Sequence, residues 1–514
     1  MKRIIYIPLD ERPCNYNYPQ HLANTRNDIE LIVPPKRMLG NKKEAANIGE
    51  IWNFVFEKAT KADGFVLSSE MLVYGGLLPS RLHYLTKDEK QKRIDNFRKL
   101  RKKNNNKPIY ISALIMRTPK FSTSDEEPDY YGYYGKEIFT RSYLTDKKNR
   151  IGLNEQEEVE LNKVGSSTPT SYITDYENRR AFNLNVNIQL LDLIKEGVID
   201  FLSIPQDDSA LYGYTAQDQD IVYRNISKKN LRTKVLVYPG ADEVGCTLVA
   251  RMLNQLLHRR PLIHYFYSST NGPHIVPLYE DRPLNESVKA HILASGCQIS
   301  SSASNADFIL AINSPGELME EASEQKIKDF TYNSYRQLNF FAEQIYSWIQ
   351  EENKPLVVAD SAFANGGDQE LIELLDEYNL LDKLISYKGW NTNCNTLGTT
   401  IAAGIFGFER NNELKIKKNL LYNLFDDVFY QSKIRKEVTH QLLPSLNANY
   451  FNLNQQDQKV ENEIKQKIIV EYKKKINNSF RNINISQFKV VSPWSRMFEI
   501  SIEFYATTKY EKGG

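Results

Sequence analysis

The sequence predicts an α/β protein with a (β/α) barrel-like domain at residues 1–270, a second Rossmann-like α/β domain at 271–412 and a small C-terminal α+β cap at 413–514. Short β-rich apolar segments alternate with helical segments from residue 4 to about 410. Strands joined by helices form parallel sheets, because each connection must cross over the sheet. Beyond residue 412 this alternation ends.

Seven apolar segments predict the strands of the first domain. They lie at 3–9, 29–35, 63–69, 108–116, 199–205, 234–240 and 261–269. Leu and Ile recur at helical spacing in 178–197, and Gly197 ends this helical pattern. Seven such strands suit a (β/α) barrel or a wide open sheet, and the sequence alone leaves both open.

A second series of apolar segments predicts the strands of the second domain. They lie at 274–280, 296–302, 306–314, 354–362 and 383–391. Five strands suffice for a doubly wound sheet, so we favour a separate domain. The alternative is that part of this series closes the barrel. After it, a charged helix at 458–478 and an alternating segment at 488–505 predict an accessory region without evident chemistry.

The composition excludes several classes of partner. The 514 residues include 66 basic and 64 acidic side chains, so no charge excess favours nucleic acid or a membrane surface. The N-terminal apolar run is too short for a secretion signal or a membrane span. Four cysteines without CxxC spacing predict free thiols, and hence a cytoplasmic protein. No cofactor is expected, and the oligomeric state is left open.

Charged side chains gather where the predicted strands end, which is where parallel α/β folds bind ligands. The residues at these ends are Asp10, Glu11, Arg12, Asn15, Glu70, Tyr74, Arg117, Gln206, Asp207, Asp208, Asp242 and Glu243. A single aspartate there is often a helix N-cap, and Asp207 alone would suit the helix expected near Ala216. Paired acids in three separate segments exceed what capping requires.

Adjacent carboxyl groups suit acid/base catalysis, because their repulsion raises the pKa of one of them. Glycoside hydrolysis uses a protonated acid beside an ionised partner. The sequence therefore predicts a glycoside hydrolase acting on a small glycan. The acid/base candidates are Asp207, Asp208, Asp242 and Glu243.

A second group of polar residues follows the predicted strands of the second domain. Sugars present apolar ring faces and many hydroxyls, which tryptophan and amide side chains complement. The substrate-binding candidates here are Asn365, Asp368, Trp390 and Asn391. The competing interpretation is a buried Trp390 beside a helix that Asn395 or Thr396 caps.

Two other functions remain open. The seven histidines show no HxH or HExxH spacing, which argues against a zinc hydrolase, but the same acids could hold Mg²⁺ or Mn²⁺ in a hydrolase or lyase. The chain could also be a non-catalytic sugar-binding protein with two α/β domains. No GxSxG or GxGxxG motif supports a serine hydrolase or a nicotinamide enzyme. The tyrosine-rich segment 120–175 predicts a long functional loop.

Several motifs resemble those of a bacterial family classed as a domain of unknown function. They are PLDERPCN, SSEMLVYGG, PQDDSALYGY, ADSAFANGGD and GWNTNCNTLG. The resemblance runs from residue 5 to about 400 and implies no particular reaction. The pair Asp207–Asp208 also resembles the acid pair of barrel enzymes that cleave N-acetylhexosaminides. That likeness implies that Asp207 orients the acetamido group and that Asp208 protonates the leaving group.

Overall fold

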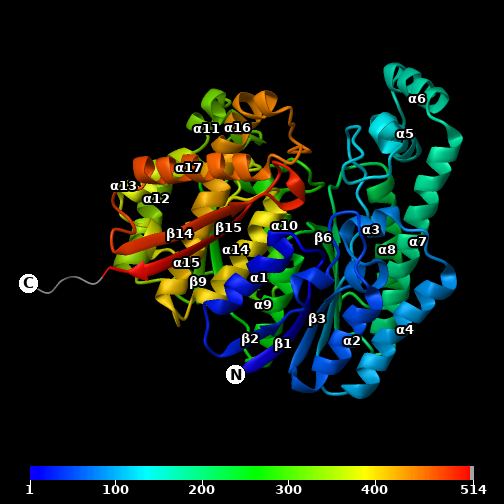
Figure 1. The fold of residues 1–514 in the computed structure, drawn as a ribbon, viewed down its shortest axis with the longest axis horizontal. Helices are drawn as coiled ribbons and strands as arrows, with labels where there is room; N and C mark the ends of the chain where they lie inside the picture. Colours follow the sequence, from blue (N-terminus) through cyan, green and yellow to red (C-terminus); the bar gives the residue numbers. More distant parts are fainter. Residues whose placement is uncertain (510–514) are drawn as a thin grey trace, which may run out of the picture.

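Two parallel sheets form the framework of the protein in a computed structural model, which describes residues 1–509 (Figure 1). The first sheet has the order β2-β1-β3-β4-β5-β6 and the second β13-β11-β9-β7-β8, with every pair parallel. The strands of the first sheet are β1 (Lys2–Ile7), β2 (Ile29–Ile32), β3 (Gly64–Ser68), β4 (Ile109–Ser112), β5 (Phe201–Gln206) and β6 (Val235–Pro239). Those of the second are β7 (Leu262–Tyr267), β8 (Gln298–Ile299), β9 (Phe308–Asn313), β11 (Leu356–Asp360) and β13 (Ser386–Lys388). The predicted α/β class with parallel sheets is confirmed.

The first sheet is open and is not the expected barrel, because its edge strands β2 and β6 do not pair with each other. The strand expected to extend it, β7, pairs with β8 and β9 in the second sheet instead. Barrel closure depends on stagger and on pairing between distant strands, which local hydrophobic patterns do not encode. The expected strand at 274–280 is also absent, since a 3₁₀ turn (Gly272–His274) and irregular chain occupy that stretch. The domain boundaries at 270 and 412 stay predictions.

A layer of helices lies between the two sheets. It consists of α1 (Pro13–Asn24), α9 (Val244–Leu256), α10 (Leu284–Ala294) and α14 (Asn393–Gly407). Helix α9 contacts β1, β3 and β4 on one side and α14 on the other, while α14 contacts β11 and β13. Helix α14 is buried along its whole length, as its many small residues suggest. The two sheets therefore share a helical layer.

Alternation along the strands explains the two faces of the first sheet. Ile4 and Tyr6 of β1 face the shared helical layer, while Ile5 and Ile7 pack with the outer helices. The outer helices are α2 (Ile48–Lys58), α4 (Lys87–Lys103), α7 (Thr170–Lys195) and α8 (Tyr214–Lys228). A π-helical turn (Glu70–Tyr74) and α3 (Leu77–Leu82) follow β3.

The tyrosine-rich segment is mostly helical. Helices α5 (Tyr131–Ile151) and α6 (Glu155–Ser167), with the start of α7, project from the rest of the molecule (Figure 1). Only the part before residue 131 is a loop. The expectation of a long loop is therefore wrong for 131–175, where polar tyrosine-rich helices show little apolar periodicity to reveal them.

The remaining elements cover the second sheet and form the C-terminal region. They are β10 (Glu320–Glu321), α11 (Thr331–Ser334), α12 (Leu338–Tyr346), β12 (Phe363–Ala364), α13 (Gln369–Glu377), α15 (Glu413–Asn423), the π-helical Leu424–Ile434, α16 (Arg435–Gln441), α17 (Asp457–Lys475), β14 (Ile483–Val491) and β15 (Ser501–Thr508). Strands β14 and β15 form an antiparallel pair, and β14 contacts α17. The predicted C-terminal helix and strands thus form.

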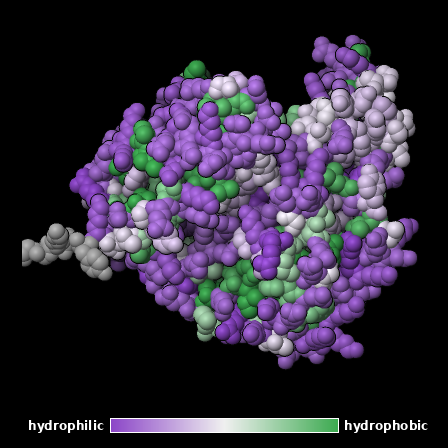
Figure 2. All heavy atoms as spheres, viewed as in Figure 1, coloured by the Kyte–Doolittle hydropathy of each residue, from purple (hydrophilic) through white to green (hydrophobic). Residues whose placement is uncertain are grey.

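The surface is largely hydrophilic in the view of Figure 2, with hydrophobic side chains in scattered patches. Within residues 1–509, no helix combines the length and the apolarity that crossing a bilayer requires.

Candidate functional site

A cavity of about 230 Å³ lies at the carboxyl ends of strands from both sheets. The loops after β4, β5 and β6 form one side, and the loops after β12 and β13 form another. Eight of the residues predicted from the strand ends line it: Arg12, Arg117, Gln206, Asp207, Asp208, Asp242, Asn365 and Asn391. Half of the sixteen predicted site residues thus line this cavity.

Arg12 ties together the ends of β1 and β6. Its Nε donates to Asp10 Oδ2 at 2.8 Å, and its two terminal nitrogens donate to Asp242 at 2.6 and 3.2 Å. Asn15 Nδ2 also donates to Asp10 (2.9 Å) and to Asp242 (3.1 Å). Pro13 begins α1 immediately after Arg12, so helix and strand fix this group from both sides. This bidentate ion pair fixes the guanidinium of Arg12 against the carboxylate of Asp242.

Two other arginines hold the Asp207–Asp208 pair. Arg81 Nη2 lies 2.5 Å from Asp207 Oδ2, and Arg117 Nη1 lies 3.2 Å from Asp208 Oδ2. The buried Glu127 joins the two arginines, accepting from Arg81 Nη1 at 3.2 Å and from Arg117 Nε at 2.8 Å. Each carboxylate of the pair therefore has its own guanidinium.

Asp208 is the carboxyl group of the pair that suits proton transfer near neutral pH. Burial, and next the neighbouring Asp207, raise its pKa to about 6, against the opposing pull of Arg117. Its side chain is 31% exposed, so it remains accessible from the cavity. A carboxyl group with such a pKa is present in both protonation states near neutral pH.

Left-handed backbone conformations collect around the cavity. Asp208 (φ +38°), Tyr279 (+70°), Asn365 (+59°) and Asn391 (+60°) all line it. Such conformations are unfavourable for residues other than glycine, least so for Asn and Asp, and they cluster at functional sites. The backbone geometry therefore points to the same place as the charges.

The C-terminal region completes the cavity, which the sequence analysis did not anticipate. Arg496 Nη1 lies 2.6 Å from Glu126 Oε1, and its Nη2 lies 2.9 Å from Glu499 Oε1. The guanidinium carbons of Arg12 and Arg496 lie 5.1 and 4.3 Å from the ring centroid of Trp494. Burial raises the pKa of Glu499 to about 7.

The sequence did carry one signal for this contribution. Pro493, Trp494 and Arg496 interrupt the strand-like alternation between β14 and β15. The indole Nε1 of Trp494 donates to Glu11 Oε1 at 2.5 Å, which places the predicted Glu11 behind the cavity wall.

The loop before α5 supplies another wall. Phe121, Thr123, Asp125 and Glu126 line the cavity. Burial alone would raise the pKa of Glu126, but Arg117, Arg496, Arg81 and Arg12 together hold that pKa well below its usual range. This loop belongs to the segment 120–175 that was expected to be functional.

Five predicted carboxylates are outside the cavity lining: Asp10 and Glu11, which contact Arg12 and Trp494, and Glu70, Glu243 and Asp368. Glu243 accepts from the backbone N–H of Ala241 (2.9 Å) and lies 3.3 Å from His291 Nε2, fully buried. Glu70 accepts from the N–H of Leu114 (2.7 Å), and burial raises its pKa. Asp368 caps α13. A strand-end acid can satisfy local backbone groups, and sequence spacing does not reveal which acids do so.

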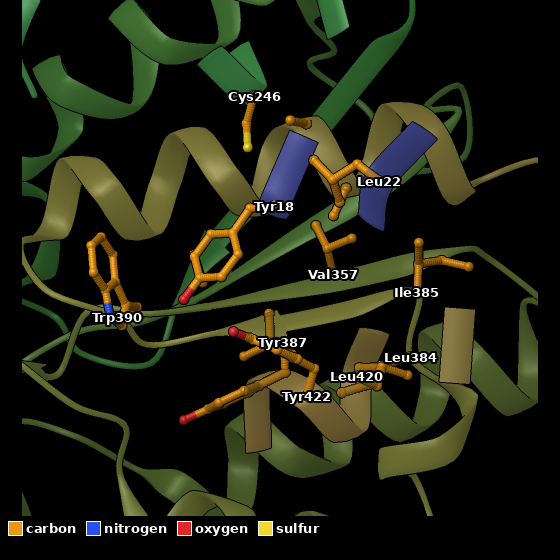
Figure 3. Close-up of a cluster of buried hydrophobic side chains, with 14 of the residues drawn as sticks. Tyr18, Leu22, Cys246, Val357, Leu384, Ile385, Tyr387, Trp390, Leu420 and Tyr422 are labelled. Atoms are coloured by element: carbon orange, nitrogen blue, oxygen red, sulfur yellow. The ribbon is translucent and has the colours of Figure 1, made fainter. Parts of the chain in front are cut away.

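Trp390 and Tyr74 also differ from the expectation. Trp390 is 2% exposed and packs edge-on against Tyr18, with ring centroids 5.9 Å apart (Figure 3). Its ring is part of the hydrophobic core and cannot stack on a sugar, so the competing interpretation is right about the buried ring but wrong about the residue that caps the helix. The helix cap there comes from Thr392, and Asn395 instead accepts from the N–H of Asp242 at 3.1 Å. Tyr74 borders a small separate cavity with Glu70.

The donor set offers no evident metal site. Across residues 1–509, no group of three or more His, Cys, Asp or Glu side chains is arranged to hold a metal ion. The carboxylates around the cavity instead face guanidinium groups. The four cysteines are buried and free.

The family assignment follows from comparison with known proteins. A search of curated proteins finds no relative of this chain. The profile of one family matches residues 4–503, which confirms the resemblance that the motifs suggested. The chain belongs to the family described as "Protein of unknown function (DUF4127)".

Proposed function

We propose that this protein is a glycoside hydrolase that acts on a small glycan by carboxylate acid/base catalysis, with Asp208 as the general acid. The supporting observation is a carboxyl group with a pKa of about 6 in the wall of a cavity, beside a second carboxylate. In the reaction, the glycosidic C–O bond breaks as Asp208 gives its proton to the leaving oxygen. Water then supplies a hydroxyl to the anomeric carbon and returns a proton.

The other acid candidates have less favourable surroundings for this role. Asp242 is held by Arg12 through two hydrogen bonds, and Glu243 lies outside the cavity lining. Asp207, held by Arg81, is placed next to Asp208 and is the candidate for orienting the substrate or stabilising positive charge. The proposal thus assigns different roles to the two adjacent acids.

The chemistry of the lining supports a carbohydrate ligand. Tyr279, Tyr450 and Phe451 offer aromatic surface, and Asn365 and Asn391 offer amides. The four buried free thiols fit the expected cytoplasmic location, which stays a prediction. No observation favours the carboxylate–metal enzyme, whereas a sugar-binding protein would share the cavity and differ only in lacking turnover.

The proposal can be tested by a screen of aryl glycosides, including N-acetylhexosaminides, with and without EDTA. We expect hydrolysis by the wild type to survive EDTA and to fall about 10²- to 10⁴-fold in Asp208→Asn. The loss should be smaller for substrates whose leaving groups need little protonation. Asp220→Asn, in an exposed ion pair on α8, is the matched control. Equal turnover in wild type and Asp208→Asn would refute the assignment.

A further inference from the structure

Carboxyl groups outnumber basic groups around the cavity. Four arginines are involved: Arg12, Arg81, Arg117 and Arg496. They form ion pairs with eight carboxyls: Asp10, Asp125, Glu126, Glu127, Asp207, Asp208, Asp242 and Glu499. Lys42 adds one more cation through its ion pair with Asp125. The surroundings of the cavity therefore remain acidic overall.

An excess of partly buried carboxylates is unfavourable unless protons or a bound cation compensate it. Protons compensate part of it, because burial raises the pKa values of Asp208 and Glu499 to about 6 and 7. Glu499 Oε2 is buried without a hydrogen-bond partner. The carboxylates that remain ionised repel an anionic ligand and attract a cationic one.

The aromatic lining points to a cation independently of the carboxylates. Phe121, Tyr279, Tyr450, Phe451 and Phe498 all line the cavity, and Tyr450 and Phe451 meet edge to face at 5.1 Å. Aromatic faces attract ammonium groups through their quadrupoles. No cluster of three or more His, Cys, Asp or Glu side chains in residues 1–509 is arranged to hold a metal ion, so an organic cation fits better.

We propose that the ligand of this cavity carries a protonated amine, so that the substrate contains an amino sugar with a free amino group rather than an N-acetylated, neutral or acidic sugar. That the ligand is a sugar rests on the proposed function. The preference for a cation rests on the charges and rings of the cavity alone.

Calorimetric titration of the full-length protein at pH 6.5 tests this inference. The probes are glucosamine, glucose, N-acetylglucosamine and glucuronate. We expect glucosamine to bind about tenfold more tightly than glucose or N-acetylglucosamine, as one partly solvated ion pair would give. Its affinity should fall in 0.5 M salt more than that of glucose. Glucuronate should bind most weakly.

Phe451→Leu is the matched variant, because this side chain is 46% exposed and its loss should not affect folding. We expect about two- to fivefold weaker binding of glucosamine and little change for glucose. Equal affinities across the four sugars, tighter binding of glucuronate, or no binding of glucosamine would overturn the inference.

This test and the hydrolase test fail separately. An amine preference without turnover of any glycoside would refute the hydrolase and leave the cation preference standing. Turnover that depends on Asp208, without any preference for an amine, would support the hydrolase and refute the cation preference.

Discussion

Two properties of Asp208 destabilise the folded chain at the level of a single residue. Its backbone is left-handed, with φ at +38°, and its carboxyl group is less easily ionised than in an unfolded chain. Such unfavourable features persist where the surrounding structure enforces them, and they concentrate at functional sites.

The raised pKa of Asp208 makes stability depend on pH. The folded chain binds this proton more tightly than the unfolded chain, so the resulting stabilisation is complete below about pH 4 and is lost as the pH rises through 6. As the pH rises from 5 to 8, we expect the free energy of unfolding of the wild type to fall by about 1 kcal/mol more than that of Asp208→Asn. Urea unfolding at both pH values measures this difference. The unfolding free energy of Asp220→Asn should change with pH as that of the wild type does. If the unfolding free energies of wild type and Asp208→Asn changed equally with pH, the raised pKa of Asp208 would be wrong.

Asn391 offers a separate test of backbone strain in the cavity wall. Its φ of +60° is tolerated by asparagine and glycine but not by alanine. We expect Asn391→Ala to lower the free energy of unfolding by about 1 kcal/mol and Asn391→Gly to change it little. Equal stability of the two variants in urea would show that this conformation is not enforced.

At the level of elements, the 3₁₀ turn Pro493–Ser495, within the connection between β14 and β15, links the C-terminal region to the cavity. The ring centroid of Trp494 lies 5.1 Å from the guanidinium carbon of Arg12 and 4.3 Å from that of Arg496, and its indole N–H donates to Glu11. Trp494 and Ser495 are both left-handed, so the turn is held by these contacts rather than by backbone preference. This element contacts residues of the candidate site although it lies far along the chain from the strand-end motifs.

Two substitutions separate the contributions of Trp494. Trp494→Phe keeps an aromatic face for the arginines and loses the N–H donor, so we expect a loss of about 1 kcal/mol in unfolding free energy. Trp494→Leu loses both and should cost about 2 to 3 kcal/mol. Chemical denaturation measures both values. If Trp494→Leu were no less stable than Trp494→Phe, the stacking would contribute nothing.

At the level of the whole molecule, local patterns predicted the strands but not their partners. Eleven of the twelve expected strand segments lie in the two large sheets, with β7 in the second sheet instead of the first, and 274–280 is not a strand. Periodicity reports burial on one or both faces, whereas pairing between distant strands depends on the entire fold. This is why an open sheet could be mistaken for a barrel.

The candidate site was predictable where its residues follow strands. Asp207, Asp208, Arg12 and Asp242 meet because the carboxyl ends of parallel strands share one edge. Arg496 could not be found this way, since only tertiary packing brings it to the cavity. The prediction that Trp390 binds a sugar was wrong, because a sequence motif does not tell whether its aromatic ring faces a cavity or the core.

The largest hydrophobic cluster joins elements of both large sheets and of the C-terminal region. A single cluster of buried side chains includes Ile4 of β1, Leu248 of α9, Ile401 of α14 and Phe504 of β15. Helix α9 is buried on both sides, between the first sheet and α14. A fragment that ends at residue 270 would therefore expose one apolar face of α9.

We accordingly expect the full-length chain to unfold in one cooperative transition and the fragment 1–270 to remain without a stable fold. Removing α14 exposes α1 and α9 to water, and exposing buried apolar side chains costs about 1.5 to 3 kcal/mol each. Calorimetry of the full chain and circular dichroism of the fragment in urea are the measurements. Two separate transitions, or a fragment with its own cooperative unfolding curve, would show that the first sheet and its helices are self-sufficient. The arginine–carboxylate network supports a single cooperative transition, since Nη1 of Arg12, at the start of α1, lies 3.6 Å from Oε2 of Glu499 in the C-terminal region.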